Sequence, residues 1–171
     1  MSHRTALSIV LTGILAALAG SVVAAPAHAQ GGGVRPAPWV FVPTGFPATL
    51  DAGLACDFPV TFDEVANQEY SRELPNGTTV VTGRLVVRLT NDTNGNSVVR
   101  NVSGPVFTST GPNGEQVVTA SGSTVSPVFA GNDATGTVGK GLFVFHGPIV
   151  FTDFVLTRVS GSYEDLCETL A

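Results

Sequence analysis

The feature that most constrains this chain is a repeated alternation of apolar and polar side chains with a period of two residues. Between residues 54 and 62 every second residue is apolar or cysteine, and a similar alternation runs through residues 78–90. Side chains of a β-strand point alternately to its two faces, so both segments are predicted to be half-buried strands. On the second segment an apolar face opposes a basic one, formed by Val81, Leu85, Val87 and Leu89 and by Arg84 and Arg88.

Turn signals separate the predicted strands. Asn94-Gly95 and Asn113-Gly114 are typical of hairpin turns, because both residue types tolerate a positive φ. A meander of about seven antiparallel strands without an intervening helix is predicted. It most simply closes into a small up-and-down barrel, which we prefer, or flattens into a two-sheet sandwich. Beyond the first segment, the predicted strands span residues 68–74, 78–90, 97–109, 115–129, 142–145 and 149–159, with a glycine-rich loop over 130–140.

A short sequence repeat is present: Gly104-Pro105 and Gly147-Pro148 are each followed by a run of residues that favour β-structure. We interpret both as corners at which a strand breaks and restarts, rather than as the trace of a duplicated domain.

The chain changes character after Ser160. Ser162 and the acidic residues that follow it match a capping arrangement at a helix N-terminus. Leu166, Cys167 and Leu170 would then fall on one helical face. A short C-terminal helix of two turns is predicted, tied to the first strand through Cys167.

The two cysteines, Cys56 and Cys167, lie near the two ends of the β-rich region. An even number of cysteines in an exported chain favours a disulfide, and closing a loop of about 110 residues would stabilise the fold by roughly 4–5 kcal/mol. The alternatives are free thiols or a metal site. Zinc takes four ligands, whereas the chain after residue 29 offers two cysteines and one histidine, His146. A disulfide, no metal and no other cofactor are therefore predicted.

The N-terminal region reads as an export signal. Arg4 precedes an uncharged apolar stretch over residues 6–25, and Ala27-His28-Ala29 fits the small-x-small pattern of signal peptidase. We therefore predict a signal peptide over residues 1–29, with an uncleaved membrane anchor as the alternative. The protein is expected to be secreted and extracellular, with no membrane association after cleavage.

Charge and length limit the partners. Residues 30–171 form one domain of 142 residues with seven basic and thirteen acidic side chains, a net charge of −6. Nucleic acid is excluded as a partner, because phosphate binding needs a basic patch. A monomer with an unidentified extracellular ligand or protein partner is expected.

Residues 30–50 form a Gly/Pro-rich leader that precedes the β domain of residues 51–171. Its four prolines oppose a helix or a central strand. Residues 39–42 are too apolar to stay in water, so we expect them to lie across the domain. Trp39 and Phe41 are candidate ligand or partner contacts, with packing against the core or mouth as the simpler interpretation.

No catalytic constellation stands out, so no catalytic residues are predicted. Seven residues separate His146 from Asp153, which places them on opposite faces of one strand or far apart along a hairpin. Two hypotheses follow. The first is a non-enzymatic secreted β-domain acting as a binding or surface-interaction module. The second is a small barrel enzyme or ligand carrier, whose enclosed pocket would need polar residues such as Asp57, Asp153 or Arg158 to converge.

Three segments resemble those of a group of small secreted actinobacterial β-rich proteins with one cysteine pair. They are the run Leu54-Ala55-Cys56-Asp57-Phe58-Pro59-Val60, the central Asn101-Val102-Ser103-Gly104-Pro105 and the closing Asp165-Leu166-Cys167-Glu168-Thr169-Leu170-Ala171. The resemblance covers roughly residues 50–171. It implies export, a β-rich fold and paired cysteines, and it carries no activity and no site residues.

Overall fold

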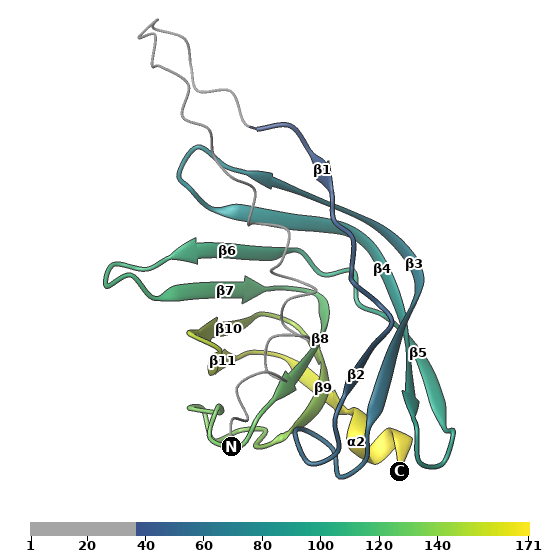
Figure 1. Ribbon diagram of the computed structural model, residues 1–171. Coiled ribbons are helices and arrows are strands. Elements are labelled where there is room, and N and C mark those ends of the chain that lie inside the picture. The colour runs from purple at the N-terminus through teal and green to yellow at the C-terminus, as the bar shows by residue number, and fades with distance from the viewer. Residues whose placement is uncertain (1–36) are drawn as a thin grey trace, which may run out of the picture.

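The computed structural model describes residues 37–171, so the predicted signal peptide and the first residues of the leader lie outside the described residues. The described chain is antiparallel β-structure with one short helix at its end (Figure 1). Its elements are β1 (Val40–Phe41), β2 (Ala48–Leu50), β3 (Val60–Glu73), β4 (Thr79–Asn91), β5 (Ser97–Asn101), β6 (Val106–Thr110), β7 (Gln116–Ala120), β8 (Ser123–Val128), β9 (Gly141–His146), β10 (Ile149–Thr152), β11 (Val155–Val159), β12 (Ser162–Asp165) and α2 (Leu166–Leu170).

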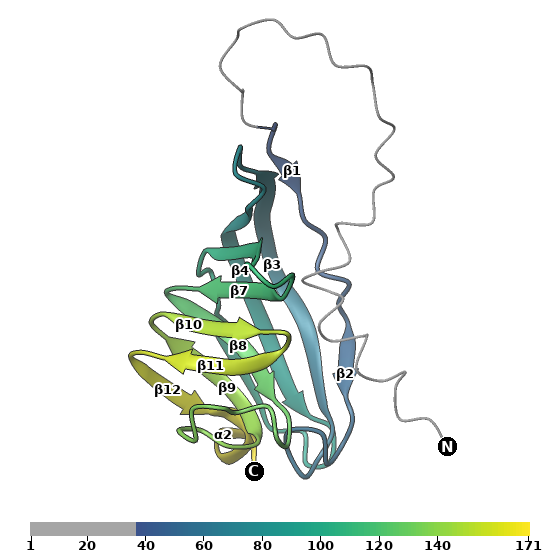
Figure 2. The ribbon, with the colours of Figure 1, turned by 90° about the vertical axis from the view of Figure 1, so that its left-hand side faces the viewer.

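The strands form two sheets. A nine-stranded sheet follows the order β1-β3-β4-β6-β7-β10-β11, with β2 also paired to β3 and β5 to β4. A three-stranded sheet follows the order β12-β9-β8. Figure 2 shows β7, β10 and β11 stacked one above another beside the long ribbons of β3 and β4.

Three glycines carry the chain from one sheet to the other. Gly122, Gly147 and Gly161 lie between β7 and β8, β9 and β10, and β11 and β12, and all have positive φ. The Gly147 N–H donates to the Gly122 carbonyl at 2.8 Å, so hydrogen bonding continues through the corner. A Cβ at Gly147 would lie 2.3 Å from the carbonyl oxygen of Ser160, and one at Gly161 would lie 2.1 Å from that of His146. Only glycine allows these strands to bend side by side.

The predicted barrel is wrong, because the sheets do not close. Within the described residues β11 pairs with β10 on one edge and carries only an isolated bridge to Asp133 on the other, and β12 pairs with β9 on one edge. A closed barrel would need every strand to be paired on both edges. At each glycine corner the chain passes between the sheets, so that β7, β10 and β11 lie in the large sheet and β8, β9 and β12 in the small one. Several strands that follow one another in the chain are paired in antiparallel fashion, as predicted, but the strands form two sheets rather than a barrel.

Several strands begin later or break earlier than their hydrophobic pattern predicts. The first begins at Val60 rather than at residue 54, because residues 52–58 form a turn and bends in which the Gly53 N–H donates to the Cys56 carbonyl. The predicted strand over residues 97–109 breaks at Gly104-Pro105, and the one over 149–159 breaks at Asp153-Phe154, which turn with positive φ. Both hairpins predicted from Asn-Gly pairs are present.

The C-terminal helix is shorter than predicted. Residues 162–165 pair with β9 as β12, so the helix starts after Asp165, whose carboxylate accepts from the N–H groups of Cys167 (2.8 Å) and Glu168 (3.3 Å).

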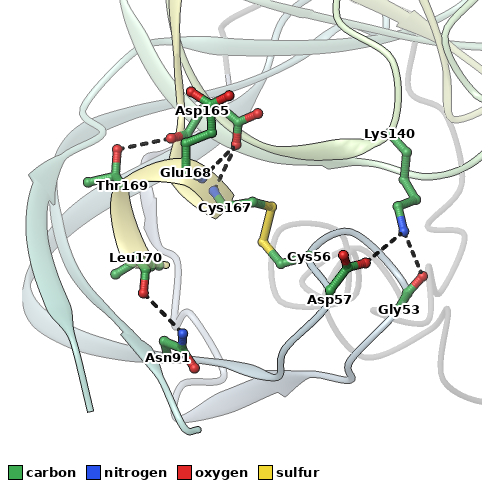
Figure 3. The surroundings of a disulfide bond; sticks show 10 residues. All are labelled: Gly53, Cys56, Asp57, Asn91, Lys140, Asp165, Cys167, Glu168, Thr169 and Leu170. Atoms are coloured by element: carbon green, nitrogen blue, oxygen red, sulfur yellow. Dashed lines mark hydrogen bonds and ion pairs between the residues drawn. A yellow bond between two sulfur atoms is a disulfide. The ribbon is translucent and has the colours of Figure 1, made fainter. Parts of the chain in front are cut away.

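The predicted disulfide is confirmed: Cys56 and Cys167 are bonded with their Cα atoms 5.2 Å apart (Figure 3). Cys56 belongs to the turn before β3 rather than to a strand. Within residues 37–171, no helix has the length and apolar composition needed to cross a bilayer.

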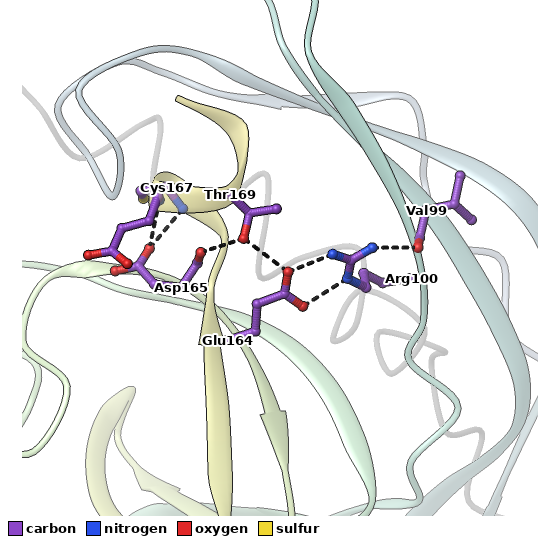
Figure 4. A network of polar contacts seen from close by, with 7 residues as sticks. Val99, Arg100, Glu164, Asp165, Cys167 and Thr169 are labelled. Carbon is purple, nitrogen blue, oxygen red and sulfur yellow. Dashed lines mark hydrogen bonds and ion pairs between the residues drawn. The ribbon is translucent and has the colours of Figure 1, made fainter.

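Polar contacts, rather than strand pairing, join the last elements to β4 and β5. The amides of Asn91 and Asn94 donate to the Leu170 carbonyl at 3.0 and 3.1 Å, which satisfies a helix-terminal acceptor. On β5, Arg100 makes a two-pronged contact with Glu164 of β12 at 2.8 and 2.6 Å (Figure 4). The hydrogen bond from Arg100 lowers the pKa of Glu164.

Strand β9 is buried on both faces and separates two apolar clusters. Leu142 and Val144 pack with the disulfide, α2 and the facing residues of β3 and β4. Phe143 and Phe145 point the other way, towards residues of β8, β10 and β11. The alternation predicted for β4 is confirmed in part. Leu85, Val87 and Leu89 are buried and its two arginines are exposed, whereas Val81 is half-buried and Val80 and Val86 on the arginine face are also buried.

A single carboxylate organises the glycine-rich loop between β8 and β9. Asp133 accepts from the Thr135 hydroxyl and from the backbone N–H groups of Thr135, Val138 and Gly139, the last three at 2.9, 3.0 and 2.9 Å. Burial raises the pKa of Asp133, but these hydrogen bonds outweigh it and lower the pKa overall.

Replacing Asp133 with alanine is expected to destabilise the domain by about 1–3 kcal/mol, because several donors of the loop lose their acceptor. Urea unfolding followed by circular dichroism measures the change. Thr137→Ala is the matched control, since the side-chain bonds of this network do not include its hydroxyl. Equal stability of the two variants would contradict the organising role of Asp133.

Candidate ligand-binding groove

An apolar groove lies between β8 and the facing parts of β3 and β4, and it contains a cavity of about 80 Å³. We call it the Glu69 groove. Its walls are almost entirely apolar or neutral and consist of Val42, Thr44, Phe46, Phe62, Glu69, Val81, Leu85, Val102, Gly104, Val106, Thr124, Val125, Ser126 and Pro127. A second cavity of about 80 Å³ adjoins it and shares Val106 and residues 124–127. Strand β8 is therefore a common wall of two adjoining cavities.

A β-bulge turns Glu69 into the groove. At the start of β3, Val60 and Phe62 face the interior. The register with β4 then shifts between Glu64 and Ala66, so the extra residue Val65 reverses which positions face inward. Glu69 consequently points into the groove and is only 8% exposed.

The strand opposite leaves room for this carboxyl. Glu69 pairs with Gly83 of β4, and residues directly opposite one another place their side chains on the same face. Gly83 has none, while Val81 and Leu85 on either side of it line the groove. The carboxyl of Glu69 thus lies on an apolar floor.

The environment of Glu69 opposes its ionisation. Burial, and secondarily repulsion from Glu64, raise its pKa to about 7. The Glu64 carboxylate accepts from the Thr44 hydroxyl at 2.6 Å and from the Asn67 amide at 3.3 Å. The side-chain hydrogen bonds among residues 37–171 do not include the Glu69 carboxyl, although its backbone N–H donates to Asn67 Oδ1 at 2.9 Å. The Glu69 side chain is thus largely buried, and its carboxyl has no donor within the described chain.

A second polar group in the groove also lacks a partner. The Thr124 hydroxyl on β8 is buried and makes no hydrogen bond with the described residues. Thr124 lines both cavities. Buried polar groups in native proteins are usually hydrogen-bonded, to protein, water or ligand. The unpaired Thr124 hydroxyl and the largely buried Glu69 carboxyl, both within apolar walls, make this groove the best candidate for a binding site.

The apolar leader segment lies against β3, as expected, and divides into an inner and an outer part. Val42 is 3% exposed, lines the groove and donates its N–H to the Glu69 carbonyl at 3.0 Å. Trp39 and Phe41 are 45% and 49% exposed. Their rings contact outer side chains of β3: Trp39 stacks under the Arg72 guanidinium at 4.5 Å, and Phe41 meets Tyr70 edge-on at 5.9 Å. Their role as ligand or partner contacts stays a prediction.

The polar residues required by the enclosed-pocket hypothesis do not converge. Asp57 pairs with Lys140 at 3.6 Å near the disulfide. Asp153 accepts from the backbone N–H of Gln116 at 2.9 Å, and Arg158 is exposed on β11. None of the three lines the groove. Sequence reasoning missed Glu69, because the inserted Val65 breaks the two-residue period that would have located it.

His146 has a partner that sequence reasoning did not identify. Its Nδ1 lies 3.1 Å from the Ser123 hydroxyl, because Ser123 and His146 are opposite each other on β8 and β9. A serine nucleophile needs an acid to orient the histidine. The side-chain hydrogen bonds among residues 37–171 link no carboxylate to His146; the Glu164 carboxylate accepts from Arg100 and Thr169 instead. Neither Ser123 nor His146 lines the groove.

Among residues 37–171, no group of three His, Cys, Asp or Glu side chains is arranged to hold a metal ion. No protein-family model, curated protein or solved structure matches the chain.

Proposed function

We propose that this protein is a non-enzymatic, secreted binding module that takes a slender, mainly apolar ligand into the Glu69 groove. The observation that supports this most strongly is the Glu69 carboxyl, 8% exposed between apolar walls and without a donor among the described residues. A largely buried carboxyl is less favourable than a solvated one unless a donor bonds to it. A ligand with an apolar body and a donor group would supply both the contacts and the hydrogen bond.

The size of the groove restricts the ligand's shape. Each of the two adjoining cavities measures about 80 Å³, below the several hundred Å³ typical of pockets for compact drug-sized molecules. Together they run along β8, with Thr124 and Val125 common to both. A narrow chain fits this space better than a fused ring system.

Extracellular binding agrees with the rest of the molecule. A disulfide that joins residues 111 apart persists in an oxidising compartment. The acidic net charge opposes binding to nucleic acid. Export and membership of the small secreted actinobacterial proteins belong to this proposal, as does the monomeric state.

The test is binding of 1-octanol to the domain, measured by calorimetry or by saturation-transfer NMR. Val106→Trp should abolish binding, because Val106 borders both cavities and the larger ring would fill them. Val99→Trp is the matched control, since Val99 is exposed on β5 and lies outside the groove.

Circular dichroism first establishes that both variants fold. Should Val106→Trp fail to fold, Val106→Phe takes its place. Undiminished binding by the folded Val106 variant, or no binding by the unmodified domain, would refute the proposed site.

A further inference from the structure

We propose that the ligand is an alkyl amine, with its ammonium group on the Glu69 carboxylate and its chain along β8 towards Thr124. This inference rests on the proposed function and adds the chemical class of the ligand to it. It uses the negative charge that Glu69 carries when ionised, whereas the proposed function requires only that its carboxyl accept a hydrogen bond.

The groove carries charge of one sign only. Glu69 is the only ionisable side chain in its lining, and Glu64 lies close enough to repel it. From β4, Val81, Gly83 and Leu85 face Glu69, and residues 124–127 of β8 and 42–46 of the leader add no charge. The Arg72 guanidinium stacks on Trp39 and does not line the groove, and Arg84 of β4 is exposed. A ligand carboxylate would therefore meet repulsion without a compensating cation.

An ammonium group fits this site better than a hydroxyl. It provides three donors and a positive charge, and hydrogen bonds between charged groups are about twice as strong as neutral ones. The difference corresponds to about a tenfold gain in affinity over an alcohol with the same chain. The apolar walls would contact the alkyl chain equally in both ligands.

The pH dependence should separate the ligands further. An ammonium group binds the ionised carboxylate, so amine binding must displace the proton that Glu69 holds below its pKa of about 7. By linkage, amine affinity should fall about 30-fold between pH 8 and pH 5.5. An alcohol can bond to either form of the carboxyl and should change much less.

The experiment compares octylamine, 1-octanol and octanoate by calorimetry at pH 8 and pH 5.5. We expect octylamine to bind tightest at pH 8 and octanoate weakest. Glu69→Gln should remove the advantage of the amine and its pH dependence while retaining octanol binding. Glu73→Gln is the matched control, because it removes one exposed carboxylate from the same strand and should leave all three affinities unchanged.

The outcomes distinguish the two proposals. Equal affinity for octylamine and octanol in the unmodified domain would overturn the amine assignment and leave the groove as a binding site. An unchanged amine affinity in Glu69→Gln would likewise overturn it. Failure of all three ligands to bind would instead refute the proposed function.

Discussion

Reduction of the Cys56–Cys167 disulfide is expected to lower the thermal midpoint of the domain by roughly 10–15 °C. The bond joins residues 111 apart, so breaking it restores about 4–5 kcal/mol of chain entropy to the unfolded state. The helix α2 should separate first, since five residues do not form a stable helix alone and Leu166 and Leu170 are held in the core.

Calorimetric melts with and without a reductant measure this shift. A Cys56→Ala, Cys167→Ala double variant should melt at the reduced midpoint and respond no further to the reductant. Two reactive thiols in the untreated protein, or a midpoint unchanged by reduction, would contradict the expectation.

The stability of the domain should fall by about 2–3 kcal/mol between pH 5 and pH 8 through Glu69 alone. Its pKa is raised from 4.5 to about 7, so the folded state holds the proton more tightly than the unfolded state does. The resulting stabilisation is complete below pH 4.5 and is lost as the pH rises through 7. Acids with lowered pKa values, such as Glu164, act in the opposite direction at lower pH.

Urea unfolding at the two pH values tests this effect. The expected quantity is the difference between the unmodified domain and Glu69→Gln, which lacks the titrating group. Glu73→Gln should retain the pH dependence, because it changes an exposed carboxylate on the same strand. Parallel stability curves for the unmodified domain and Glu69→Gln would show that Glu69 does not titrate in this range.

The parts of the fold that the sequence predicts well are those governed by local rules. The alternation in β4 identifies its buried face correctly, and the Asn-Gly pairs locate two hairpins. The cysteine count predicts the disulfide. Each of these depends on neighbouring residues or on a pairing with a single candidate partner.

The parts that it predicts poorly depend on distant strands. Gly122 and Gly161 resemble ordinary turn glycines, yet they form a corner only because His146 and Gly147 lie beside them. The same applies to residues 162–165, whose capping pattern yields to pairing with β9. The positions of the corners and the pairing of residues 162–165 are determined by contacts between distant segments, so no local sequence pattern predicts them.

The position of Glu69 in the candidate site also depends on contacts between distant strands, so the sequence alone does not predict it. A strict two-residue period from Val60 would turn Gln68 and Tyr70 inward and Glu69 outward. One inserted residue, Val65, reverses this assignment. The position of a bulge depends on the pairing with β4, so the buried acid is visible only once that pairing is known.

The disulfide also determines how tension would pass through the domain. Cys56 and Cys167 lie near the two ends of the described chain, with both sheets connected between them. A pulling force applied at the two termini would run through the sulfur–sulfur bond and bypass residues 57–166. Strands β3 to β12 would therefore be shielded from the load, whereas β1, β2 and the groove residues Val42, Thr44 and Phe46 precede Cys56 and would bear it.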